Sequence, residues 1–172
     1  MGLNLSQVPS GTRIFIDSNI LLYVFFKHPV YGKSCLAFIK RIEENDIAGF
    51  IDEFVLNEVF HKLMVTAIMN CHRCSPAEAI AFVKKTPEIL RELPQLWEAC
   101  EILETVNVKN ISGPLFSESR VNAQIYNLLA TDAVHVAAMR KENIIHLASN
   151  DTDFSRVDFL HLWRPEQDNS LF

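Results

Sequence analysis

The chain has 172 residues, of which 49% are apolar, and its net charge is −5. This length predicts a single domain with a full hydrophobic core, and the negative charge argues against a protein that coats nucleic acid through bulk electrostatics. No window approaches the roughly 18 uninterrupted apolar residues of a membrane span, and the N-terminus lacks the features of a signal peptide. We therefore expect a cytoplasmic protein without a membrane segment.

Four cysteines, Cys35, Cys71, Cys74 and Cys100, are scattered along the chain. They are too few for a disulfide scaffold in a chain with so large a core, which predicts reduced thiols. Cys71 and Cys74 have the spacing of half a zinc site, but no second Cys or His pair follows. We favour a helix end with partly buried thiols at this position.

An apolar, β-prone run from Ile14 to Ile16 stops abruptly at Asp17. Such a run predicts a strand that is buried on both faces, as in a parallel sheet. In open sheets of this kind ligands bind beyond the carboxyl ends of the strands, which makes Asp17 a candidate metal ligand. The competing interpretation is that Asp17 or Ser18 only caps the helix that follows.

Helical and strand patterns alternate over the next part of the chain. They predict a short apolar helix, an amphipathic helix and a second strand, at Ile20 to Phe26, Tyr31 to Asp46 and Ala48 to Ile51. Asp52 follows this strand and can cap the next helix, which runs from Glu53 to about Met69. We therefore expect an α/β protein.

Glu58 lies within the apolar stripe of this last helix, next to Val59 and Phe60. Burying a carboxylate in such surroundings is costly unless a positive group pairs with it. Lys62, one turn further along, is the ordinary candidate for that partner. The alternative, that Glu58 is a metal ligand, depends on other acids reaching the same place.

The section from about residue 66 to 115 is mostly helical and carries no recognisable chemistry. Ser75-Pro76-Ala77-Glu78 has the residues of a strong helix start, and Pro87 and Pro94 predict breaks between the helices that follow. A short strand at Asn107 to Ile111 and a turn at Ser112-Gly113-Pro114 end the section.

The C-terminal part repeats the opening pattern. We expect a helix from Ser117 to Leu129, and then a helix that Thr131 caps, that has Asp132 in its first turn and that ends near Glu142. Ile144 to Ala148 is an apolar strand that halts at polar residues, among them Ser149, Asp151 and Asp153. The alternation in Asp158 to Trp163 predicts an edge strand.

Four acids could therefore meet: Asp17 and Asp151 after strands, Asp132 in a first helical turn, and Glu58 in an apolar stripe. Like charges brought together raise one another's pKa, so such a cluster is stable in its ionised form only with cations present. A site made of carboxylates alone suits Mg²⁺ or Mn²⁺. A pair of these ions can generate a hydroxide and stabilise both oxygens in phosphodiester cleavage.

At this point the chain resembles the PIN domain family, and within it the VapC-type toxin ribonucleases. The matching segments occur in the family's order, and they are Ile16 to Leu22, Leu56 to Val59 with Lys62-Leu63, Thr131 to Ala133 with Ala137-Ala138, and Leu147 to Phe154. The resemblance implies a Rossmann-like three-layer α/β/α sandwich with a mainly parallel sheet. It also implies one PIN-like domain over residues 1–172, with a core of about 13–163.

The resemblance further implies that Asp17, Glu58, Asp132 and Asp151 bind Mg²⁺ or Mn²⁺. Asn19 and Ser149 match polar positions that support the site in the family. Asp153 is an additional ligand or an outer-shell acid, and we favour Asp151 over it as the fourth ligand because Asp151 is nearer the strand end.

The implied function is endonucleolytic cleavage of RNA, by a toxin that a small antitoxin protein silences. The long section of residues 66–115 then serves partner binding or substrate shape. Two alternatives remain open: a PIN-type binding or assembly module whose acids are little used, and a doubly wound domain whose acids are only helix caps. Apolar helix faces in excess of one core predict a homodimer.

Overall fold

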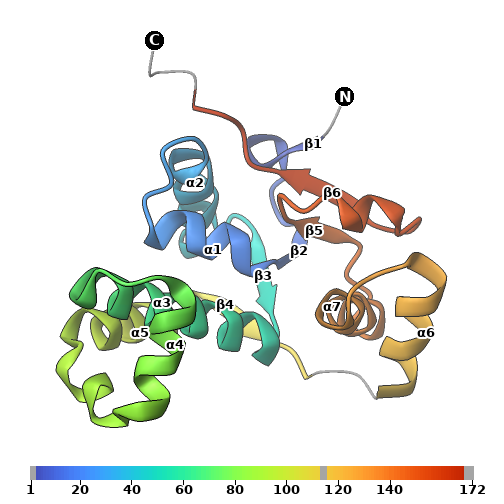
Figure 1. Ribbon diagram of the computed structural model, residues 1–172. Helices are drawn as coiled ribbons and strands as arrows, with labels where there is room; N and C mark the ends of the chain where they lie inside the picture. The colour runs from blue at the N-terminus through green and yellow to red at the C-terminus, as the bar shows by residue number, and fades with distance from the viewer. Residues whose placement is uncertain (1–2, 113–115, 169–172) are drawn as a thin grey trace. The chain divides into compact units, whose positions relative to one another are not determined.

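The structure, a computed structural model, describes residues 3–112 and 116–168 (Figure 1). The predicted turn at Ser112-Gly113-Pro114 lies largely outside the described residues. The chain divides into two compact units, one formed by residues 1–56 and 107–172 and the other by residues 57–106. Within the described ranges, no helix combines the length and the apolar character that crossing a membrane requires.

The first unit is built on an open sheet whose described strands are all parallel, in the order β1-β6-β5-β2-β3-β4. In the central register, Phe15 of β2 is opposite Phe50 of β3 and Leu147 of β5. This architecture confirms the predicted α/β sandwich with a parallel sheet. The strands are β1 (Leu3–Asn4), β2 (Arg13–Ile16), β3 (Ala48–Ile51), β4 (Val108–Asn110), β5 (His146–Ala148) and β6 (His161–Arg164).

Helices flank this sheet and close its core (Figure 1). Ala133, Ala137 and Ala138, the small residues of the last long helix, are all buried, which lets that helix pack closely. The helices of this unit are α1 (Ser18–Phe25), α2 (Gly32–Glu43), the start of α3 (Glu53–His72), α6 (Phe116–Tyr126) and α7 (Ala130–Lys141), with short 3₁₀ helices η1 (Leu5–Gln7) and η3 (Asp153–Arg156).

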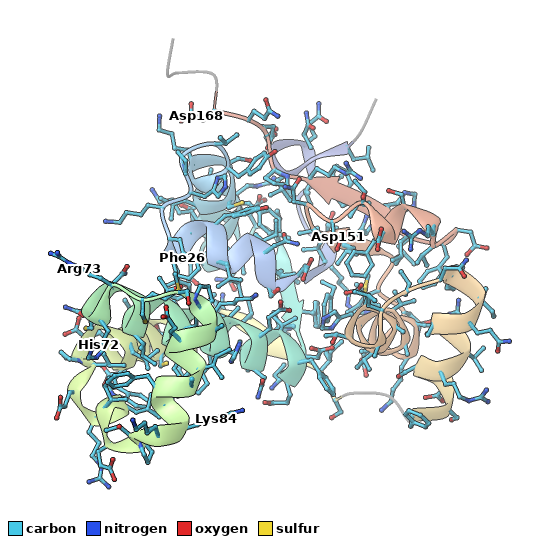
Figure 2. The ribbon with its side chains drawn as sticks, in the orientation of Figure 1. Phe26, His72, Arg73, Lys84, Asp151 and Asp168 are labelled. Carbon is cyan, nitrogen blue, oxygen red and sulfur yellow. The ribbon has the colours of Figure 1, made fainter. Side chains whose placement is uncertain are left out.

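The second unit is helical. It contains the rest of α3, then α4 (Pro76–Lys85), the 3₁₀ helix η2 (Pro87–Glu92) and α5 (Pro94–Thr105). Ser75 and Glu78 form the predicted capping box at the start of α4, and the two predicted breaks occur at Pro87 and Pro94. His72 lies at the end of α3 (Figure 2). It stacks on Phe82 with ring centroids 4.5 Å apart.

Three sequence predictions are wrong in detail. Cys71 is exposed rather than partly buried, although Cys74 is half-buried as expected. Thr131 does not cap α7, because the helix starts at Ala130 with Leu129 as its N-cap; Asp132 is still in the first turn. The strand β5 begins at His146 and not at Ile144, because the Ile144 N–H bonds to the Met139 carbonyl at 2.8 Å and closes α7.

The predicted edge strand over Asp158 to Trp163 also needs correction. The strand β6 starts at His161 and lies between β5 and β1, so it is not at the edge. The outer position belongs to β1, in which Leu3 is opposite Trp163. A two-residue strand such as β1 is too short to show any periodicity in sequence.

Candidate metal centre

Asp17 lies directly after β2 and is 7% exposed. Its N–H donates to the Ala148 carbonyl at 3.0 Å, which brings the ends of β2 and β5 together. Asp17 is the N-cap residue of α1 by its backbone, but its side chain makes no capping hydrogen bond. Instead its Oδ2 atom accepts from the hydroxyl of Ser149 at 2.5 Å and from the amide of Asn19. The carboxylate therefore belongs to a polar network at the strand ends and does not cap α1.

Ser149 is the centre of that network. Its side chain is fully buried, and its hydroxyl donates to Asp17 while it accepts from Asn19 Nδ2 and the Asp151 N–H, each at 3.0 Å. Asn19 Oδ1 in turn accepts from the Asn150 N–H at 3.1 Å. These bonds join the loop after β5 to the start of α1, and they orient the Asp17 carboxylate.

Asp151 lies in the loop that follows β5 (Figure 2), and Asp153 is the first residue of η3. The Asp153 N–H donates to Asp151 Oδ1 at 2.8 Å. The carboxylate of Asp153 accepts from Arg156 at 2.5 Å, and this guanidinium also donates to the Asn127 carbonyl at 2.6 Å. Because a guanidinium already compensates the charge of Asp153, this residue is less suited than Asp151 to hold a cation.

Asp132 lies in the first turn of α7. Its pKa reflects burial and the negative charges of the other acids. Burial, together with smaller effects of the negative charges of Asp17, Asp151 and Asp153, raises the pKa of its carboxyl to about 6 against an opposing effect of His135. Aspartates from three separate parts of the chain therefore contribute to one negative potential. A divalent cation relieves this repulsion.

Glu58 lies on α3, just inside the second compact unit, and is half-buried. Its role as a ligand together with the aspartates of the first unit stays a prediction.

The carboxylates are not arranged as a preformed ligand cage. In the described part of the chain, no group of three or more His, Cys, Asp or Glu side chains stands where it could hold a metal ion. Oxygens of Asp17, Asp151 and Asp153 accept hydrogen bonds from Ser149, the backbone and Arg156. The donor set still fits Mg²⁺ or Mn²⁺, since carboxylate oxygens are the ligands these ions prefer.

His135 is a residue next to the acids that the sequence analysis missed. It follows Asp132 by one turn on α7, it is buried, and it bonds to Asp52, which was predicted only as the cap of α3. Asp52 does cap α3, since its Oδ1 accepts from the N–H groups of Phe54 and Val55 at 3.0 Å each. A histidine between the apolar residues of α7, one turn after Asp132, was the available signal.

Comparisons with known proteins agree with this fold. The model of the PIN domain family matches residues 14–160. The chain belongs to the PIN domain family. It is 31% identical over 150 residues to Ribonuclease VapC2 of Methanocaldococcus jannaschii, an alignment that covers 87% of this chain and 92% of that protein.

Two solved structures share the fold. One is VapBC2 from Rickettsia felis bound to a DNA fragment from their promoter, with 18% identity, coverage of 91% of this chain and 100% of that chain, and a TM-score of 0.58. The other is a protein from Pyrobaculum aerophilum, with 15% identity, coverage of 88% and 91%, and a TM-score of 0.52.

Proposed function

We propose that this protein is an endoribonuclease that cleaves RNA phosphodiester bonds with Mg²⁺ or Mn²⁺ at Asp17, Glu58, Asp132 and Asp151. The observation that carries the proposal is the network at the strand ends, in which Ser149 holds the Asp17 carboxylate and accepts from the Asp151 N–H. The raised pKa of Asp132, to which burial and the charges of Asp17 and Asp151 contribute, supports it. The relative that is 31% identical is itself named a ribonuclease. Together they favour a hydrolase over a domain whose acids are only helix caps.

In this mechanism the side chains act mainly by geometry. Asp17, Glu58, Asp132 and Asp151 would hold the divalent ions, which when bound would supply a water of lowered pKa and stabilise negative charge on the reacting oxygens. Ser149 and Asn19 hold the Asp17 carboxylate in one orientation through the bonds to its Oδ2 atom. Asp132 projects from the first turn of α7 as a second ligand, and Arg156 holds Asp153 aside as an outer acid.

The proposal is tested by RNA cleavage with purified protein, Mn²⁺ and a pool of structured RNAs. We expect Asp17→Asn and Asp132→Asn each to lower the cleavage rate at least about a hundredfold, because each removes a charged metal ligand. Glu44→Gln, an exposed acid just past the end of α2, is the matched control and should cut at the parent rate. Equal cleavage by the parent and both aspartate variants would refute the proposal.

A protein antitoxin is the partner we propose for this ribonuclease, and the cytoplasm is its proposed location. The support comes from the solved VapBC2 structure, in which one chain shares the fold of this protein. We assign the section of residues 66–115, which contains most of the second compact unit, to partner binding or substrate shape. Co-expression with the product of a neighbouring small gene, followed by co-purification, tests the partner.

A PIN-type binding or assembly module is the second candidate function. It is favoured by the absence of a preformed three-ligand metal group among residues 3–112 and 116–168. A parent protein that cuts no RNA in any pool with Mn²⁺, but still assembles with a partner, would establish the module.

We also propose a homodimer. Val121, Ile125 and Leu129, spaced four residues apart on α6 and in the segment after it, are 40%, 59% and 73% exposed. Large apolar side chains at such exposure are typical of a surface that a second copy covers.

A further inference from the structure

A buried carboxylate and imidazole lie next to the acidic cluster without being among the proposed metal ligands. Asp52, directly after β3, is 0% exposed, and His135 of α7 is 1% exposed. The His135 Nδ1 atom is 2.8 Å from Asp52 Oδ2. Burying two ionisable groups costs free energy unless their hydrogen bonds are well formed, so the bonds of this pair decide whether it can persist.

The two oxygens of Asp52 hold two different helices. Oδ1 accepts from the N–H groups of Phe54 and Val55, at 3.0 Å each, and so caps the first turn of α3. Oδ2 accepts from His135 in the middle of α7. One side chain therefore joins the start of α3 to α7 at the end of β3.

His135 is oriented by the same bond. A carboxylate can only accept, so the Nδ1 atom of His135 carries the hydrogen. The ring packs against Phe15 of β2, with centroids 5.3 Å apart. Phe15 precedes Asp17 by two residues, and His135 follows Asp132 by one helical turn. The imidazole thus joins α7 to β2, close to Asp132 on α7 and to Asp17 after β2.

The charges around His135 indicate the same proximity. Burial lowers the pKa of its imidazole, but the hydrogen bond to Asp52 and the negative charges of Asp52, Asp17 and Asp132 outweigh burial and raise it overall. The groups that act on this imidazole come from β2, from the end of β3 and from α7 itself. The pair is therefore electrostatically part of the surroundings of the acidic cluster.

We propose that Asp52 and His135 are a positioning pair, which holds α7 against β2 and β3 and so fixes Asp132 relative to Asp17. This inference rests on the proposed metal centre and names two residues that act on it through α7. Neither residue contacts metal or RNA in this account. Residues that orient metal ligands in this indirect way change metal affinity by about ten- to a hundredfold when they are removed.

The test is Mn²⁺ binding by titration calorimetry, which requires no cleavage. His135→Phe keeps a ring against Phe15 but loses the bond, and Asp52→Ser keeps a side chain that can cap α3 but cannot reach His135. Each should weaken Mn²⁺ binding about tenfold. His135→Asn places an amide N–H near the position of Nδ1, so it should restore most of the affinity, which a merely space-filling role for His135 would not predict.

Met139→Ala is the matched control, because Met139 is also fully buried on α7, one turn beyond His135. It should lower the melting temperature and leave the Mn²⁺ affinity near that of the parent. Parent-like affinity in His135→Phe and Asp52→Ser would overturn the inference, as would an equal loss in Met139→Ala. Should His135→Phe fail to fold, Asp52→Ser and His135→Asn carry the comparison.

Crystal structures of the metal-free parent and the Asp52→Ser protein separate this inference from the proposed function. A parent that binds no Mn²⁺ would end the proposed metal centre. The positioning role would then be decided by the structures: displacement of α7 relative to β2 in the variant supports it, and an unmoved α7 overturns it.

Discussion

At the scale of single residues, the proposed metal centre combines a destabilising negative charge at Asp132 with hydrogen bonds that hold the Asp17 carboxylate in place. Asp132 is half-buried and exposed to the negative charges of other acids, whereas Asp17 is held by Ser149 and Asn19. Such an arrangement costs stability in the metal-free protein, and a cation at the proposed centre would offset that cost. The account therefore predicts that removing the charge of Asp132 stabilises the protein while it abolishes function.

Asp132→Asn should stabilise the metal-free protein at pH 7.5 and not at pH 4. The folded-state pKa of Asp132 is about 6, above its ordinary value of 3.8, so the free-energy penalty develops as pH rises between these values. The shift corresponds to at most about 3 kcal/mol, and solvent screening of a half-buried group reduces the expected gain to about 1 to 2 kcal/mol. Urea unfolding at both pH values measures it.

Asp46→Asn is a control of opposite sign. Hydrogen bonds from Ser10 and Arg41 lower the pKa of Asp46, so its ionised form stabilises the fold above the unfolded pKa, and this stability is lost as pH falls through the folded pKa. The variant should lose stability at neutral pH. A loss of stability in Asp132→Asn at pH 7.5 would contradict the electrostatic interpretation of the cluster.

The thiols should differ sharply in reactivity. Burial, with a smaller effect of the charge of Glu166, raises the pKa of Cys35 to about 12, whereas Cys71 is exposed. Because the thiolate is the reactive form, iodoacetamide at pH 8 should modify Cys71 within minutes and leave Cys35 unmodified in the folded protein. Peptide mass spectrometry reads this out, and fast modification of Cys35 would show that its surroundings open readily.

At the scale of elements, β3 depends on a glycine. A Cβ atom at Gly49 would lie 2.9 Å from Ile16 Cδ1 and 3.1 Å from side-chain carbons of Ile42 and Val108. Gly49→Ala should therefore destabilise the protein by about 1 to 3 kcal/mol through overpacking. Because Ile16 directly precedes Asp17, the change should also weaken Mn²⁺ binding.

Urea unfolding of Gly49→Ala measures this effect. Ala37→Ser, an exposed change on α2, should stay within about 0.5 kcal/mol of the parent. A parent-like stability of Gly49→Ala would show that the neighbouring side chains can move aside at no cost.

Elements with local signals could be predicted from the sequence. The run Arg13 to Ile16, the strand Ala48–Ile51, the cap at Asp52 and the capping box at Ser75 are all encoded by neighbouring residues, and the structure has each of them. β1 and the inner position of β6 depend on pairing between the two ends of the chain, which no local pattern records.

The candidate site also combines features that local sequence encodes with features that depend on remote partners. Acids at strand ends and in a first turn could be predicted because parallel strands present their carboxyl ends at one edge. His135 and Arg156 could not, since their roles depend on Asp52 and on the Asn127 carbonyl, partners remote in sequence. Sequence reasoning thus finds the acids more readily than the groups that orient them.

At the scale of the whole molecule, the exposed apolar side chains on and after α6 predict self-association. Light scattering of the purified protein should give the mass of two chains. Leu129→Lys, at a side chain that is 73% exposed, should shift the mass toward one chain without loss of fold, because the substitution puts a charge into the proposed interface. A parent protein with the mass of one chain would remove the homodimer.

The central claim is that residues distant along the chain share a divalent cation. A crystal soaked in Mn²⁺ tests it most directly, by the anomalous density that the ion adds. The account predicts a peak in contact with the carboxylates of Asp17, Asp132, Asp151 and Glu58. A map without a peak at these residues, or one in which the Glu58 carboxylate lies on the opposite side of the molecule from Asp17 and Asp132, would contradict it.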